Sequence, residues 1–140
     1  MEKLKRILGN EHIKQFLKFC VVGVIGTAID FGLLYLLVEF GHVYYLLAAT
    51  ISFIAAVINN YLLNKIWTFQ DKNRNFFKQF VQFLIVSLVG LGLNLLLLYL
   101  LVQYAHLWYI LAKVLATGVV LIWNFIANKF WTFKKEKVLL

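Results

Sequence analysis

Four long stretches of the chain are almost free of charge, and the charged residues gather between them. Asp30 is the single charged residue in 19–38, and none occurs in 40–64, 79–112 or 114–128. A helix that crosses about 30 Å of hydrocarbon needs about 20 apolar residues. The pattern therefore predicts four transmembrane helices, near residues 18–39, 44–65, 79–103 and 107–129.

The composition agrees with a membrane protein and leaves little room for other classes. Of 140 residues, 63% are hydrophobic and 14% are charged, whereas soluble domains average about 25% charged residues. No residues remain for a soluble catalytic domain, and no nucleophile–base pair is present, so we do not expect an enzyme. The single cysteine, Cys20, excludes an internal disulfide and a cysteine-based zinc cluster. The three histidines are scattered, so we expect neither a metal site nor a cofactor.

The basic residues predict the orientation of the chain. Thirteen of the fourteen lysines and arginines lie in three segments, 3–18, 65–78 and 129–137, and none lies in the turns near Gly41 and Ala105. The positive-inside rule then places both termini and the middle loop in the cytoplasm. The net charge of +8 suits contact with anionic membrane lipid. Because the charges are spread around helix ends, we do not expect a nucleic acid as partner.

One eleven-residue sequence motif, the repeated phrase, occurs twice. NNYLLNKIWTF at 59–69 returns as WNFIANKFWTF at 123–133, and 16–69 aligns with 80–133 without a gap, with 21 of 54 pairs identical. Each unit is a hairpin that begins and ends on the same side, so the two units are parallel repeats about an axis near the membrane normal. We predict an all-α membrane protein of four transmembrane helices, arranged as two parallel-repeat helical hairpins with cytoplasmic termini. Residues 1–140 form a single domain in this interpretation.

Asparagines and small residues share one face of the second helix of each hairpin. That face carries Ala48, Ser52, Ala56, Asn60 and Asn64 in the first unit, and Ala112, Ala116, Val120, Asn124 and Asn128 in the second. Small residues at every fourth position let two helices approach closely. The asparagines then either hydrogen-bond across that contact or form a polar patch for a lipid head group, and both roles stay open. Trp67 and Trp131 are interpreted as interface anchors, and Lys65 and Lys129 as lysines that reach toward the interface.

Three polar residues lie deeper in the predicted helices: Asp30, Asn94 and Lys113. A centred Asp or Lys costs about 2.5–3.5 kcal/mol, so such residues usually face a partner or a cavity. Asn94, which we also expect to contact substrate, is the repeat partner of Asp30, whereas Lys113 replaces Ala49. The depths of Asp30 and Lys113 differ by about 6 Å, which a lysine side chain can span. The pair is either a structural ion pair or a substrate site, with Lys113 at an anionic phosphate and Asp30 at sugar hydroxyls or at Lys113.

The chain resembles the GtrA-like family over about residues 14–134. The resemblance depends on the two hairpins, on the phrase Asn-Lys-x-Trp-Thr-Phe that ends each of them, and on the spacing of Phe19, Gly23 and Gly26. It implies a small multi-pass protein of the bacterial cytoplasmic membrane. It also implies a link to glycosylation of cell-wall or surface polysaccharides such as teichoic acids.

The resemblance further implies translocation of a polyprenyl-phosphate-linked sugar to the outer leaflet, where a prenyl-phosphate glycosyltransferase system uses it. The family's polar positions map onto Asn60, Asn64, Asn124 and Lys113, and its aromatic positions onto Phe69 and Phe83. The chain departs from the family at Asn60, where a small residue is common, and at Ser87, where many members have arginine.

Four helices make a narrow groove, so a homo-oligomer is expected. The alternatives are a membrane adaptor that recruits a glycosyltransferase and a small proton-coupled exporter that uses Asp30.

Overall fold

The computed structural model describes residues 1–134, apart from the side chains of Leu4, Ile7 and Leu8. This part of the chain is helical: α1 Glu2–Leu8, α2 Glu11–Glu39, α3 Tyr45–Leu63, α4 Phe76–Gln103 and α5 Tyr109–Ala127. Two π-helical turns, η1 Asn64–Thr68 and η2 Asn128–Thr132, follow α3 and α5 directly. Lys135 and Lys137, which were counted among the basic residues that predict the orientation, lie outside the described residues.

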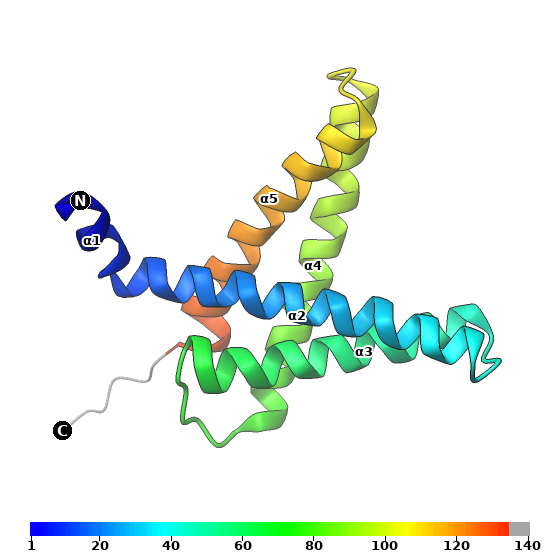
Figure 1. The fold of residues 1–140 in the computed structure, drawn as a ribbon, viewed down its shortest axis with the longest axis horizontal. Coiled ribbons are helices and arrows are strands. Elements are labelled where there is room, and N and C mark those ends of the chain that lie inside the picture. Colours follow the sequence, from blue (N-terminus) through cyan, green and yellow to red (C-terminus); the bar gives the residue numbers. More distant parts are fainter. Residues whose placement is uncertain (135–140) are drawn as a thin grey trace. The chain divides into compact units, whose positions relative to one another are not determined.

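The predicted all-α architecture of four long apolar helices in two hairpins is confirmed. Four helical segments are long and apolar enough to cross a membrane: Glu11–Glu39, Tyr45–Thr68, Phe76–Gln103 and Tyr109–Thr132. α2 packs along α3, and α4 packs along α5 (Figure 1). The chain divides into two compact units, Met1–Lys72 and Asn73–Leu140. The first contains hairpin 1, made of α2, α3 and η1, and the second contains hairpin 2, made of α4, α5 and η2.

Side-chain caps extend two helices beyond the apolar stretches that predicted them. α2 begins at Glu11 instead of near residue 18, because the side chain of Asn10 accepts a hydrogen bond of 2.9 Å from the backbone N–H of His12. α4 begins at Phe76 instead of near residue 79, and the side chain of Asn75 caps it in a similar way. The short helix α1 was not predicted. These starts lie in polar segments, where hydrophobic periodicity gives no signal.

Both hairpins reverse direction by the same turn. The closing backbone hydrogen bonds are Val43 N–H to Leu37 O at 3.0 Å and Leu107 N–H to Leu101 O at 3.1 Å. His42 and His106 occupy the left-handed region in these turns, with φ of 51° and 55°. A residue without β-branching tolerates this region better than a β-branched one. The repeated histidine is therefore a turn residue in each hairpin.

The predicted stripes of small residues are buried, as expected for close helix packing. In hairpin 1 the exposed fraction is 0% for Ala48 and Ser52 and 5% for Ala56. In hairpin 2 it is 0% for Ala112 and Ala116. The first helix of each hairpin supplies the opposing buried residues, which are Phe19, Val22 and Gly26 in α2 and Phe83, Val86 and Gly90 in α4.

In each hairpin a glycine of the first helix packs against an asparagine of the second. A Cβ atom added to Gly26 would overlap the amide of Asn60, and one added to Gly90 would lie 2.6 Å from Oδ1 of Asn124. Real Cβ atoms essentially never approach a neighbour this closely. The missing side chain of the glycine therefore makes the space that the amide of the neighbouring helix fills, in both repeats.

The outward faces of the hairpins are apolar. Large side chains in the middle of the helices are widely exposed, including Phe31 at 69%, Val24 at 71%, Leu95 at 60% and Val114 at 62%. Contiguous exposed apolar surface of this kind is unfavourable in water. It suits a lipid environment, in which helices satisfy their backbone hydrogen bonds internally. Together with the four spans, these faces are those of a multi-pass membrane protein.

The buried stripe makes a direct prediction for Ser52, whose side chain has no exposed surface. Ser52→Leu adds volume at the contact of α2 with α3, and overpacking of this kind costs about 1–3 kcal/mol. We expect a lower thermal unfolding temperature for the detergent-purified variant. The matched control is Ile51→Leu, at a neighbouring side chain that is 41% exposed. Equal unfolding temperatures for the two variants would contradict the packing described above.

Candidate functional site

The repeated phrase ends each hairpin in a π-helical turn that buries an asparagine. Asn64 and Asn128 are 2% and 1% exposed. Their side-chain oxygens accept hydrogen bonds of 2.8 Å from the hydroxyls of Thr68 and Thr132. Such π-helical turns are rare and often lie at functional sites. Thr68 and Thr132 were not among the residues predicted from the sequence, although the repeated spacing of four residues between Asn and Thr indicates this contact.

The phenylalanine that ends the phrase packs back onto the first helix of the same hairpin. The rings of Phe69 and Phe19 lie 6.4 Å apart between centroids, and the rings of Phe133 and Phe83 lie 6.2 Å apart, with the same interplanar angle of 58°. Phe69 and Phe133 are 4% and 3% exposed. The phrase therefore fixes the end of each second helix against the start of the first, which is a structural role in both repeats.

Asn60 and Asn124 differ from the other two asparagines, because their amide oxygens have no partner. Both residues are half-buried. Within the described part of the chain, Oδ1 of each is buried and makes no hydrogen bond. Leaving such an acceptor unsatisfied costs about 1–3 kcal/mol. Each of these oxygens lies against the glycine of the neighbouring helix, whereas the oxygens of Asn64 and Asn128 accept one hydrogen bond each.

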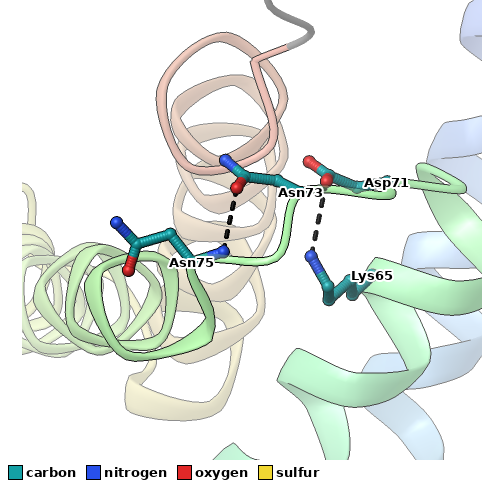
Figure 2. Close-up of polar contacts among 4 residues, drawn as sticks. All are labelled: Lys65, Asp71, Asn73 and Asn75. Atoms are coloured by element: carbon teal, nitrogen blue, oxygen red, sulfur yellow. Dashed lines mark hydrogen bonds and ion pairs between the residues drawn. The ribbon is translucent and has the colours of Figure 1, made fainter.

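A buried ion pair follows the phrase in hairpin 1 (Figure 2). Nζ of Lys65 lies 3.3 Å from Oδ1 of Asp71, and the two side chains are 5% and 6% exposed. The backbone N–H of Asp71 also donates to the carbonyl oxygen of Lys65 at 2.8 Å. Beyond the pair, the side chain of Asn73 accepts a hydrogen bond from the backbone N–H of Asn75 at 3.0 Å. Lys65 therefore does not reach toward the interface, as the sequence suggested, but is buried and paired.

The equivalent lysine of hairpin 2 has a different environment. The ammonium group of Lys129 lies over the rings of Phe125 and Phe130, 5.5 and 5.9 Å from their centroids. The sequence position that corresponds to Asp71 is occupied by Lys135. The acidic partner of hairpin 1 is therefore not repeated at this position, and the two hairpins differ in charge where their packing is the same.

Hairpin 2 also has a tryptophan, Trp123, at the position where hairpin 1 has an asparagine. Nε1 of Trp123 donates to the carbonyl oxygen of Val86 at 3.3 Å. The repeat position in hairpin 1 is Asn59, whose buried Nδ2 has no hydrogen-bond partner in the described residues. Trp123 and Trp131 line an open, apolar groove of about 410 Å³. The two repeats therefore differ in side-chain chemistry at this position.

The three deep polar residues lie in separate helices. Asp30 is half-buried in α2 and Asn94 is half-buried in α4. Lys113 is exposed on α5 and lines an open hollow of about 370 Å³. Asp30 belongs to hairpin 1 and Lys113 to hairpin 2, so their ion pair stays a prediction. The binding roles predicted for these residues and for the four asparagines also stay predictions.

The buried pair in hairpin 1 predicts the effect of removing its acid. Asp71→Leu leaves the ammonium of Lys65 buried beside an apolar side chain, and breaking such a pair costs about 3 kcal/mol or more. We expect lower thermal stability of the purified protein, and recovery when Lys65→Met is added. Lys72→Met, a change at an exposed neighbour, is the control. If Asp71→Leu is as stable as this control, the pair contributes nothing to stability.

Comparison with known proteins identifies the family. The family described as "GtrA/DPMS, transmembrane domain" matches residues 18–133. The uncharacterized membrane protein YngA of Bacillus subtilis (strain 168) is 40% identical over 123 residues, which cover 88% of this chain and 82% of YngA. The uncharacterized membrane protein YwcD of the same organism is 31% identical over 122 residues, covering 85% of this chain and 96% of YwcD.

A third relative is much longer than this chain. The dolichol-phosphate mannosyltransferase of Pyrococcus furiosus is 32% identical over 114 residues, which cover 78% of this chain but 30% of that protein. The match therefore concerns a minor part of the mannosyltransferase. The family match spans both hairpins and both copies of the repeated phrase. The chain belongs to the GtrA/DPMS transmembrane domain family.

Proposed function

We propose that this protein translocates a polyprenyl-phosphate-linked sugar across the bacterial cytoplasmic membrane, for glycosylation of a cell-wall or surface polysaccharide such as teichoic acid. The observation that carries the proposal is Lys113, an exposed lysine within the apolar span of α5. Membership of the family supports the link to prenyl-linked sugars. A relative named as a dolichol-phosphate mannosyltransferase supports the same chemistry.

Lys113 needs a negative charge that its own hairpin does not supply. The sequence contains no aspartate or glutamate between residues 73 and 134. A lysine at membrane depth is costly unless it meets an anion or water. The phosphate of a prenyl-linked sugar provides such an anion, while its prenyl tail stays in the surrounding lipid. Asp30 and the amide groups of Asn94, Asn60 and Asn124 are then the proposed contacts for sugar hydroxyls.

The charge distribution sets the direction of the proposed transport. With both termini and the middle loop in the cytoplasm, the substrate starts in the inner leaflet, and the basic segments bind anionic lipid there. The sequence has no nucleotide-binding motif, so consumption of the sugar by a glycosyltransferase outside drives transport downhill. The chain is small for a path that must admit a phosphate and a sugar, and we propose that it works as a homo-oligomer.

One observation favours a second function, a membrane adaptor for a glycosyltransferase. In the Pyrococcus protein, the part that resembles this chain makes up 30% of a longer chain named as a mannosyltransferase. A domain attached to an enzyme in one protein can recruit a separate enzyme in another. An adaptor depends on its contact surface and has no need for a lysine within the span. The role of Lys113 therefore separates the two functions.

Lys113→Ala gives hairpin 2 the residue that hairpin 1 has at the same repeat position, Ala49. We expect normal abundance in the membrane and loss of polymer glycosylation, because the phosphate loses its counter-charge. Glycosylation is measured on the isolated polymer and abundance by immunoblot. The control is Leu115→Ala, a change at an exposed residue that does not line the hollow beside Lys113. Full glycosylation at normal abundance would contradict the carrier and favour the adaptor.

A structural Asp30–Lys113 pair gives a different pattern. Lys113→Ala alone would then lower abundance, and adding Asp30→Ala would restore it, because a buried pair replaced by apolar residues is often neutral. The carrier predicts no restoration of glycosylation by the second change.

A further inference from the structure

Three polar side chains follow one another on a single face of α5. Tyr109, Lys113 and Thr117 are spaced by four residues, which places them on the same side of the helix. They line the same open hollow of about 370 Å³, together with Ile110 and Val114. The corresponding positions of hairpin 1 are Tyr45, Ala49 and Phe53. Hairpin 2 thus has an ammonium and a hydroxyl where hairpin 1 has a methyl group and a phenyl ring.

The hydroxyl of Thr117 is exceptional among the serine and threonine hydroxyls of the described residues. Six other serine and threonine hydroxyls donate hydrogen bonds within their own hairpin: Thr27, Thr50, Ser52, Thr68, Ser87 and Thr132. Thr117 is exposed, and its hydroxyl makes no hydrogen bond in the described structure. Serine and threonine in apolar helices usually bond back to a carbonyl of the preceding turn. Thr117 therefore keeps a donor available beside Lys113, in a region where lipid tails offer no acceptor.

Loss of acidic residues distinguishes hairpin 2 from hairpin 1. Asp30, Glu39 and Asp71 correspond in the repeat to Asn94, Gln103 and Lys135. Residues 1–72 contain seven basic and five acidic residues, whereas residues 73–140 contain seven basic and one acidic residue. The second half of the chain is therefore the half suited to receive an anion.

We propose that Tyr109, Lys113 and Thr117 form a binding site for the phosphate group of a prenyl phosphate. The ammonium of Lys113 supplies the charge, and the hydroxyls of Thr117 and Tyr109 donate hydrogen bonds to phosphate oxygens, which are strong when the acceptor is charged. Neighbouring members are about 6 Å apart along the helix axis, and the long, flexible lysine stem brings its ammonium to the level of either hydroxyl. The prenyl tail lies along the apolar face of α5. This site rests on the proposed function and adds Tyr109 and Thr117 to it.

The site is tested by binding of farnesyl phosphate to the purified full-length protein in phosphatidylcholine nanodiscs, with farnesol as the uncharged comparison. Thr117→Val and Tyr109→Phe each remove one hydroxyl and should weaken binding about three- to tenfold, and Lys113→Met should weaken it about thirtyfold or more. Thr117→Ser keeps the hydroxyl and should bind like the wild type. Tyr45→Phe, the same change at the repeat position of hairpin 1, should also leave the affinity unchanged. Thermal unfolding of each variant confirms that it is folded.

The outcomes separate this site from the proposed function. Wild-type affinity in Thr117→Val and Tyr109→Phe, with a loss in Lys113→Met, would overturn the three-residue site and leave the carrier function standing. Equal binding of farnesyl phosphate and farnesol by the wild type would contradict both. Equally effective competition by phosphatidylglycerol in the nanodisc would overturn the assignment to prenyl phosphate, because the site would then hold bilayer phospholipid.

Discussion

Hydrocarbon offers no hydrogen-bond partners, and this constraint accounts for most of the polar contacts in the structure. Backbone groups are satisfied by the helices, and six of the seven serine and threonine hydroxyls in the described residues bond to their own hairpin. The buried amides of the repeated phrase accept from threonines one turn away. Lys65, buried at the end of hairpin 1, is paired with Asp71. The proposed ligand site depends on Lys113 and Thr117, two exposed polar residues within the apolar span of α5.

The duplicated hairpin separates packing from chemistry. Both copies keep the glycine–asparagine contact, the π-helical turn and the phenylalanine pair. The copies differ in charge, since hairpin 2 has lost the acids of hairpin 1 and gained Lys113. A repeat that keeps its internal packing can change its exposed residues at little cost to that packing, because those side chains lie outside the contact between the two helices of the hairpin.

Hydrophobic patterning predicted the structural features that depend on many residues at once. These are the four helices, the two hairpins and the buried stripes of small residues. It missed features that depend on one or two side chains, such as the caps at Asn10 and Asn75 and the helix α1. The Lys65–Asp71 pair was also missed, because it depends on a chain reversal after the π-helical turn, with Gln70 at a φ of 47°. The unpaired state of Thr117 is a property of the three-dimensional contacts, and no sequence period encodes it.

The central claim is that this chain alone moves a phosphate-linked sugar lipid between leaflets. It is tested most directly with purified protein in phosphatidylcholine vesicles that contain a fluorescent, short-chain prenyl-phosphate sugar. A reagent that does not cross the membrane quenches the probe in the outer leaflet and so reports how fast inner-leaflet probe appears there. The account predicts rapid appearance with the wild-type protein and the slow, protein-free rate with Lys113→Ala. A protein-free rate with folded wild-type protein would contradict it.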